Sequence, residues 1–265
     1  MKPVLKLVDV SYDYHTRRGE THALDHISFE VNEGEFYGIV GPSGSGKTTL
    51  LSVLAGVLTP THGEVIVEGG EGVQNAVGYM LQRDQLLEWR TIKRNVLLGL
   101  EINHRLTGEN VAYAEQLLKK YGLHEFSSSY PHELSGGMRQ RAALIRTLVM
   151  RPKVVLLDEP FSALDFQTRL SVGDDVHRII KAEGLTAILV THDISEAIAL
   201  CDRVAVLTPR PATVKEVFDV DIAEKTDTLA RRDDPEFAKI FKRIWKELEI
   251  HEDKIGESGS PQVLT

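Results

Sequence analysis

Residues 36–48 read Phe36-Tyr-Gly-Ile-Val-Gly-Pro-Ser-Gly-Ser-Gly-Lys-Thr48, an apolar run that ends in a loop of glycine and serine. The second part matches the pattern G-x-x-x-x-G-K-[ST], which binds phosphate when it follows a strand and opens a helix. Glycines let successive backbone N–H groups converge on phosphate oxygens, and the helix adds the positive end of its dipole. The stretch therefore predicts a nucleotide site and leaves the nucleotide base open.

Two side chains of this loop have predicted roles of their own. Lys47 is expected to reach the outer phosphates, and Thr48 is expected to ligate magnesium. The other predicted nucleotide-binding residues of the stretch are Gly41, Pro42, Ser43, Gly44, Ser45, Gly46 and Thr49. A chance Gly-rich turn is the alternative, and average residue usage produces the pattern by accident in roughly one such chain per hundred.

Strand-like and helix-like segments alternate along the chain. Strand patterns occur at 6–14, 23–29, 36–40, 154–157, 187–190 and 204–207, and helix patterns at 48–58, 92–100, 111–121 and 139–150. Such alternation favours a mainly parallel sheet covered on both faces. The predicted fold is α/β, a P-loop NTPase core with a mainly parallel sheet, an N-terminal antiparallel β region and an α-helical subdomain inserted at about residues 83–150.

The end of the chain has a different pattern. Apolar side chains fall at helical spacing at Phe237, Ile240, Phe241, Ile244 and Leu248. They predict a C-terminal helix within 231–250 whose apolar stripe packs on the body of the protein. Residues 251–265 are polar and contain Gly and Ser, so they are expected to form a disordered tail.

Two carboxylates follow the apolar strand at 154–157. Asp158 suits the magnesium shell, and Glu159 suits the orientation and deprotonation of a water that attacks the terminal phosphate. His192 follows the strand at 187–190, so it is expected at the same sheet edge and in contact with the outer phosphate. Acidic strand ends and isolated histidines are often structural, and it is their convergence with the phosphate loop that favours a site.

Composition and charge exclude several classes of protein. Lys and Arg number 31 against 39 Asp and Glu, a net charge of −8 over 265 residues, so nucleic acid is not an expected partner. No uncharged apolar stretch approaches the roughly 18 residues of a membrane span. Lys6 and Asp9 interrupt the first apolar run, unlike a secretory signal. The single Cys201 suits a reducing compartment such as the cytoplasm.

A further motif, Leu134-Ser-Gly-Gly-Met138, opens an arginine-rich helix. With this motif the chain resembles the ATPase subunit of ATP-binding cassette (ABC) systems, whose signature is Leu-Ser-Gly-Gly-Gln. Met138 replaces the glutamine, while Ser135, Gly136 and Gly137 are kept. A hydroxyl and two close backbone amides at a helix N-terminus form a second anion site.

The resemblance implies a head-to-tail dimer with a second copy of the chain or a homologous ATPase subunit. Each ATP would lie between the phosphate loop of one subunit and the Ser135 motif of the other. It also implies that Gln82 senses magnesium and the γ-phosphate and that Asp165, in Ser162-Ala-Leu-Asp165, communicates across the dimer. Adenine is expected to stack on Tyr14, with Tyr12 as the alternative.

Taken together, the predicted cofactors are ATP and Mg²⁺, and residues 1–230 form the predicted ATPase domain. The expected catalytic residues are Glu159, His192, Gln82 and Lys47, and the expected metal-binding residues are Thr48, Gln82 and Asp158.

Three stretches resemble the nitrate/sulfonate/taurine importer group. They are residues 85–96, residues 134–141 and Thr208-Pro-Arg-Pro211, which follows the last core strand. Glu88 stands where the group has proline before Trp89. Simple packing of Trp89 in the helical insert is the alternative explanation for that tryptophan.

The function that the resemblance implies is energy coupling for solute import. ATP closes the dimer, the region 82–95 moves an integral membrane permease, and hydrolysis resets the system. A solute-binding protein is an indirect partner, and the chain is expected at the cytoplasmic face of the cell membrane as a peripheral protein. The alternative is a cassette ATPase that drives a non-transport partner in cell-envelope mechanics. A kinase or GTPase with the same loop leaves the Ser135 motif unexplained.

Overall fold

The computed structural model describes residues 2–17, 19–69, 72–222 and 227–249. Its strands are β1 (Pro3–Thr16), β2 (Gly19–Asn32), β3 (Phe36–Val40), β4 (His62–Val67), β5 (Val77–Met80), β6 (Val154–Asp158), β7 (Thr186–Val190), β8 (Arg203–Leu207) and β9 (Val214–Asp219). Its α-helices are α1 (Lys47–Leu54), α2 (Val73–Ala76), α3 (Ile92–Val96), α4 (Leu98–Ile102), α5 (Gly108–Lys120), α6 (Gly136–Leu148), α7 (Phe166–Ala182), α8 (Ile194–Leu200) and α9 (Pro235–Glu249). Short 3₁₀ helices occur at η1 (His124–Phe126), η2 (Pro131–Glu133) and η3 (Ala230–Asp233). The tail expected at 251–265 lies outside the described residues.

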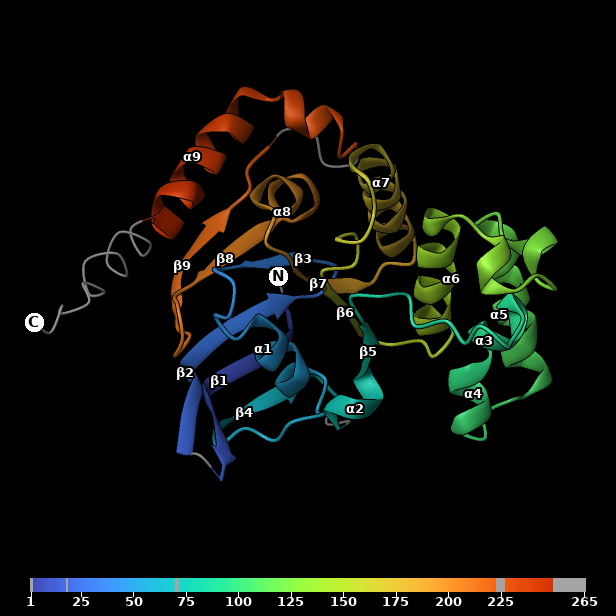
Figure 1. Cartoon of the computed structure of the whole chain (residues 1–265), viewed down its shortest axis with the longest axis horizontal. Coiled ribbons are helices and arrows are strands. Elements are labelled where there is room, and N and C mark those ends of the chain that lie inside the picture. The colour runs from blue at the N-terminus through green and yellow to red at the C-terminus, as the bar shows by residue number, and fades with distance from the viewer. Residues whose placement is uncertain (1, 18, 70–71, 223–226, 250–265) are drawn as a thin grey trace, which may run out of the picture.

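A six-stranded sheet in the order β5-β6-β7-β3-β8-β9 forms the centre of the molecule (Figure 1). Its neighbouring strands are parallel except β8 and β9, which are antiparallel. Every residue of β3, β6 and β7 is buried, as in a parallel sheet that is covered on both faces. The predicted α/β class with a mainly parallel sheet is confirmed.

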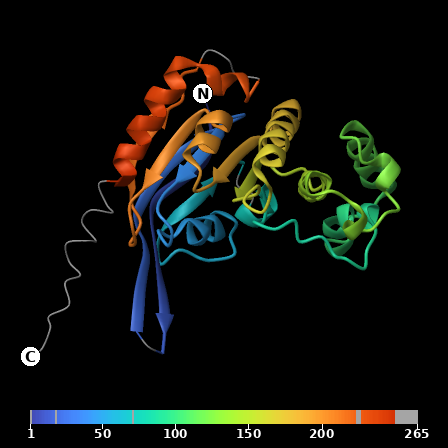
Figure 2. The same ribbon diagram turned by 45° about the horizontal axis from the view of Figure 1, so that its top comes forward.

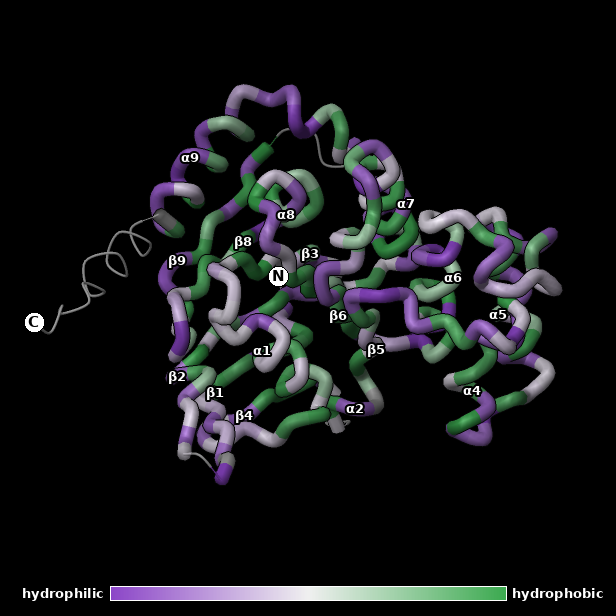
Figure 3. Tube along the Cα trace, in the orientation of Figure 1, coloured by the Kyte–Doolittle hydropathy of each residue, from purple (hydrophilic) through white to green (hydrophobic). Residues whose placement is uncertain are grey.

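The two faces of this sheet pack into two separate cores, because side chains alternate across a strand. Phe36 and Val40 of β3 belong to the core that contains residues of α6, α7, α8 and α9. Tyr37 and Ile39 belong to the core that contains residues of α1, β1 and β2. Figure 3 shows hydrophobic residues along the central strands and more hydrophilic residues on the outer helices and loops.

The predicted N-terminal antiparallel region is a three-stranded sheet in the order β2-β1-β4. β1 and β2 form a long hairpin in which Leu7 pairs with Phe29, and this hairpin extends away from the body in Figure 2. The strands at 6–14 and 23–29 are therefore parts of longer elements. Among the described residues, no helix is both long enough and apolar enough to cross a membrane.

A lobe of helices, α3 to α6, lies between β5 and β6 in the sequence and beside the sheet in Figure 1. The single helix predicted at 92–100 is wrong: the chain forms α3 and α4 instead. Leu97 separates them with φ −78° and ψ −7°, and this ψ departs from the helical value of about −42°. Asn95 is buried, and its amide donates to the carbonyls of Leu87, Arg90 and Thr91, which anchors the segment before α3.

His177 of α7 is a buried titratable group in the first of these cores. Its ring lies 5.4 Å from the ring of Phe36, and neither ring nitrogen has a hydrogen-bond partner among the described residues. Burial, together with the positive charges of Lys181 and Arg231, lowers the pKa of His177 to about 4. The folded protein therefore holds this imidazole neutral.

We predict that replacing His177 with leucine makes the protein more stable to acid. The unfolded histidine has a pKa of about 6.5, so between that value and the folded value of about 4 the unfolded chain binds the extra proton. The free energy of unfolding of the wild type should therefore fall as pH decreases through this window. Urea denaturation at pH 7, 6 and 5 should show a smaller fall for His177→Leu.

The matched control for this prediction is His124→Gln, which removes an exposed histidine. Its free energy of unfolding should follow the wild-type pH dependence. Equal pH slopes for the wild type and His177→Leu would show that His177 does not contribute to acid sensitivity.

Candidate functional site

Three segments that carry predicted site residues lie where three neighbouring parallel strands end. β7 lies between β6 and β3 in the sheet. The phosphate loop follows β3, Asp158 is the last residue of β6, and His192 follows β7 by two residues. Parallel strands direct their carboxyl ends to one edge of a sheet, which is where open α/β sheets bind ligands. The topology therefore brings these three segments together.

The phosphate loop adopts the backbone that its glycines permit. Gly44 has φ +75° and Gly46, the N-cap of α1, has φ +102°, values that favour glycine. The Lys47 ammonium is buried and donates to the carbonyl oxygens of Gly41 at 2.8 Å and Pro42 at 2.9 Å. Burial lowers the pKa of Lys47, while the charge of Glu159 acts in the opposite direction. The loop thus curls around its own lysine.

One hydroxyl in the loop is buried without a hydrogen-bond partner in the described part of the chain. Ser45 is 1% exposed, and its Oγ has no hydrogen-bond partner among the described residues. A Cβ on Gly41 would lie 3.0 Å from this Oγ and 3.1 Å from the Cβ of Leu207, so only glycine fits there without a shift. A buried polar atom without a partner is unfavourable unless a bound group satisfies it. This orphan hydroxyl fits a site that accepts phosphate oxygens.

Glu159 holds the centre of a small polar cluster. Its Oε2 lies 3.3 Å from Nε2 of Gln82 and 3.2 Å from Nδ1 of His192. Its backbone N–H donates to the carbonyl of Val190 at 2.8 Å, although its φ of +43° lies in the left-handed region. Such backbone strain costs about 1–3 kcal/mol and is concentrated at functional sites. The structure brings together three of the predicted catalytic residues.

Asp158 is buried beside this cluster and is bonded to a residue that sequence reasoning missed. Tyr79 of β5 donates its hydroxyl to Oδ2 of Asp158 at 3.1 Å. Burial raises the pKa of Asp158, whereas the Tyr79 hydrogen bond and the charge of Lys47 oppose that rise. No local pattern marks Tyr79, because its contact depends on the pairing of β5 with β6.

A cavity of about 590 Å³ lies over the phosphate loop. It is lined by Tyr14, Ala23, Ser43, Gly44, Gly46, Lys47, Thr48, Thr49, Glu159, His192 and Arg210. The Tyr14 hydroxyl lies 3.1 Å from Oγ1 of Thr49, and its ring packs edge-to-face on Tyr12. Tyr14 lines the cavity and Tyr12 does not, which favours Tyr14 as the aromatic residue of the site. Ala23 and Arg210 are lining residues that the sequence analysis did not assign.

Nine of the predicted site residues do not line this cavity: Gly41, Pro42, Ser45, Gln82, Asp158, Ser135, Gly136, Gly137 and Asp165. Ser135 caps α6, and its hydroxyl accepts from the N–H of Met138 at 3.3 Å. Gly136 and Gly137 follow it in the first turn. Asp165 caps α7, where the bond from Thr168 lowers its pKa. The Ser135 motif therefore lies outside the cavity over the phosphate loop of its own chain.

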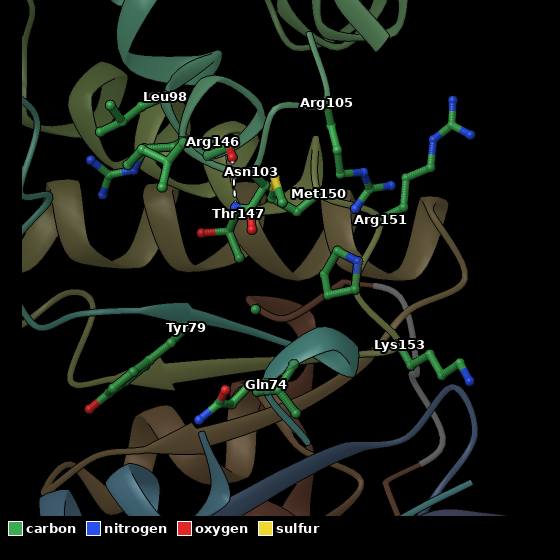
Figure 4. A pocket seen from close by; sticks show the side chains of 15 residues that line it. Gln74, Tyr79, Leu98, Asn103, Arg105, Arg146, Thr147, Met150, Arg151 and Lys153 are labelled. Carbon is green, nitrogen blue, oxygen red and sulfur yellow. Dashed lines mark hydrogen bonds between the residues drawn. The ribbon is translucent and has the colours of Figure 1, made fainter. Parts of the chain in front are cut away.

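A larger cavity, of about 870 Å³, lies between the sheet and the helical lobe (Figure 4). Tyr79 and Gln74 line it from the sheet side, and Leu98 and Met150 line it from the lobe side. Ile102 of α4 is a further lining residue. Its ionisable lining residues other than Tyr79 are all basic: Arg105, Arg146, Arg151 and Lys153. Tyr79 also bonds Asp158, so one side chain links this cavity to the acidic end of β6.

Comparisons with known proteins identify the family. The family model described as ABC transporter matches residues 24–162. The ABC transporter ATP-binding protein YtlC of Bacillus subtilis, itself uncharacterized, is 48% identical over 243 residues, or 90% of this chain and 93% of the relative. The nitrate transport protein NasD of Klebsiella oxytoca is 37% identical, and the match covers 92% of this chain and 95% of the relative. The taurine import ATP-binding protein TauB of Rhizobium johnstonii is 38% identical, and the match covers 94% of this chain and 98% of the relative.

A solved structure with the same fold carries a nucleotide. It is a dimeric, post-hydrolysis state of an ATP-binding cassette bound to ADP and Pi. It is 30% identical to this chain with a TM-score of 0.67, covering 82% of this chain and 98% of that one. The resemblance to ABC ATPases of the nitrate/sulfonate/taurine group is thereby confirmed. The chain belongs to the ABC transporter family, as an ATP-binding subunit that hydrolyses ATP to drive transport.

Proposed function

We propose that this chain is the ATP-hydrolysing subunit of an importer for small anionic or zwitterionic solutes of the nitrate, sulfonate or taurine type. The observation that carries the proposal is the meeting of Glu159, His192 and Gln82 beside a phosphate loop with an unsatisfied buried hydroxyl. The nitrate and taurine relatives support the solute class and favour import over envelope mechanics. The chain would act at the cytoplasmic face of the membrane, bound to a permease. A solute-binding protein would deliver the solute to that permease.

Magnesium would be held by residues on two sides of the phosphate loop. The hydroxyl of Thr48, the carboxylate of Asp158 and the amide oxygen of Gln82 are the hard oxygen donors that Mg²⁺ prefers, with phosphate oxygens and water completing its shell. When bound, the ion neutralises charge on the phosphates. The hydrogen bond from Tyr79 would keep Asp158 oriented toward that position.

The remaining side chains of the site would position phosphates and water. Lys47 would turn from its loop carbonyls to the outer phosphates, and the hydroxyl of Ser45 would bond a phosphate oxygen. Glu159 would accept a proton from the attacking water, and His192 would contact the terminal phosphate from the next strand. Gln82 would report the state of the site, because it contacts Glu159 and begins the segment that leads to α3.

The position of the Ser135 motif supports a dimeric site. Ser135, Gly136 and Gly137 present a hydroxyl and amides at the start of α6 but do not line the chain's own nucleotide cavity. A second copy arranged head to tail would bring this motif to the open side of the phosphate loop. Asp165, at the start of α7, would then lie near the same interface.

The larger cavity is the proposed docking surface for the permease. Ile102 on its lobe side is 66% exposed, and its ionisable lining residues other than Tyr79 are all basic. An amphipathic cytoplasmic segment of the permease with acidic side chains would match both properties. The segment between β5 and α3, which contains Gln82, connects this surface to the nucleotide site.

Glu159→Gln tests the catalytic assignment. The variant keeps the size of the side chain and loses the base, so ATP hydrolysis should fall by about 10²–10⁴-fold while ATP binding is retained. Steady-state phosphate release and nucleotide titration measure the two quantities. Glu64→Gln, at an exposed carboxylate of β4, is the control and should behave as wild type. Wild-type turnover in Glu159→Gln would refute the assignment.

Ser135→Arg tests the shared site. A bulky cation at the cap of α6 should block ATP-driven dimerisation and leave nucleotide binding by a single subunit intact. Analytical ultracentrifugation with ATP, in a Glu159→Gln background that prevents hydrolysis, gives the oligomeric state. Ser128→Arg, at an exposed position outside the motif, is the matched control. Normal dimers of Ser135→Arg would contradict the head-to-tail model.

Ile102→Asp tests the docking surface and the importer itself. Gentle purification of the tagged wild type from its native membranes should capture a multi-span permease, identified by mass spectrometry. Ile102→Asp should lose this partner and keep the ATPase activity of the isolated subunit. Val217→Asp, at an exposed residue of β9, should retain it. A captured partner with few membrane spans and a large external domain would contradict the importer function. If Ile102→Asp still captured the permease, the proposed docking surface would be wrong.

A further inference from the structure

The loop between β8 and β9, residues 208–213, lies beside the nucleotide site and has no role in the function proposed above. Within the loop, the N–H of Thr208 donates to the carbonyl of Thr213 at 3.0 Å, and the N–H of Thr213 donates to Oγ1 of Thr208 at 2.9 Å. The loop is also tied to β2, since Ala212 donates to the carbonyl of Ala23 and accepts from the N–H of Asp25. The first two bonds brace the loop, and the other two hold it on β2, whose Ala23 lines the cavity.

The same loop is packed against the phosphate loop. A Cβ on Gly46 would lie 3.0 Å from the carbonyl oxygen of Ala23 and 3.8 Å from the Cβ of Ala212. Gly46 directly precedes Lys47, the residue expected at the outer phosphates. Arg210 stands two residues before Ala212 and lines the nucleotide cavity with Thr48. The tether therefore presents the Arg210 side chain to the cavity from a side that no predicted motif occupies.

The guanidinium of Arg210 forms no ion pair within the described part of the chain. Its side chain is exposed, and the structure records no carboxylate partner for it among the described residues. By contrast, Arg203 on the preceding strand pairs with Glu35 at 2.5 Å. Lys47, the other cation of the cavity, already contacts two loop carbonyls. An unpaired guanidinium at the rim of a phosphate-binding cavity is matched to a polyanionic ligand.

We propose that Arg210 is a nucleotide-binding residue whose guanidinium contacts the phosphates of ATP from the β8–β9 loop. The inference rests on the proposed ATP site and adds a contact outside its motifs. A guanidinium stays charged, carries five N–H donors in a plane and bonds phosphate oxygens in pairs. Its contact would hold ATP and ADP and would contribute little to the binding of an uncharged nucleoside.

The test compares three ligands on four proteins. ATP, ADP and adenosine compete against a fluorescent nucleotide with magnesium chelated, so that no hydrolysis occurs. Arg210→Gln should weaken ATP and ADP binding by about tenfold, the loss expected for a partly exposed charge-assisted hydrogen bond, with adenosine unchanged. Arg210→Lys, which keeps the charge, should recover most of the loss. Arg178→Gln, which removes an exposed arginine of α7 outside the cavity, should match wild type.

Each other result overturns the inference in a distinct way. Unchanged ATP affinity in Arg210→Gln would show that Arg210 does not contact bound ATP. An equal loss of adenosine affinity would indicate that the guanidinium contacts the nucleoside instead of the phosphates. Failure of the wild type to bind ATP would refute the proposed function itself, which separates that failure from failure of the Arg210 contact. Thermal melting of each variant confirms that the loop substitutions leave the fold intact.

Discussion

The parallel register of β6, β7 and β3 is the constraint on which the rest of the site depends. Asp158 is paired with Val190 of β7, and Val190 is paired with Ile39 of β3. The ladder continues past the strands, because the N–H of Glu159 donates to Val190 and the N–H of Thr191 donates to Ile39. These bonds place the acidic strand end and the segment before His192 beside the phosphate loop. A shift of one register position would separate the groups that the chemistry needs.

Several features of the site are energetically unfavourable on their own. Glu159 has a left-handed backbone, Ser45 has an unsatisfied hydroxyl, and burial disfavours the charged forms of Asp158 and Lys47. A buried sheet packed on both faces can retain such unfavourable features, since its strands cannot move individually without loss of apolar contact. The bound nucleotide would satisfy several of them at once. These features suit the proposed binding of a ligand with many negative oxygens.

Contacts across the helical lobe connect the nucleotide site with the proposed docking surface. Arg146 of α6 donates to the carbonyls of Asp84 and Gln85, which follow Gln82 in the sequence. The helix that Ser135 caps is therefore bonded to the segment that contacts Glu159. A permease seated between the lobe and the sheet would contact both. The bonds from Arg146 link the helix capped by Ser135 with the segment that follows Gln82.

The sequence alone determined the features that are local in the chain. The glycine–lysine loop, the acidic end of β6 and the bounds of β3 follow from spacing and apolar runs over a few residues, and the Ser135 motif led to the family. The tertiary structure decided what depends on pairing between distant segments. The edge strands β4 and β9 are short and half exposed, so they lack a clear apolar pattern. Tyr79 and Arg210 reach the site only through strand register and loop tethers, which no local pattern encodes.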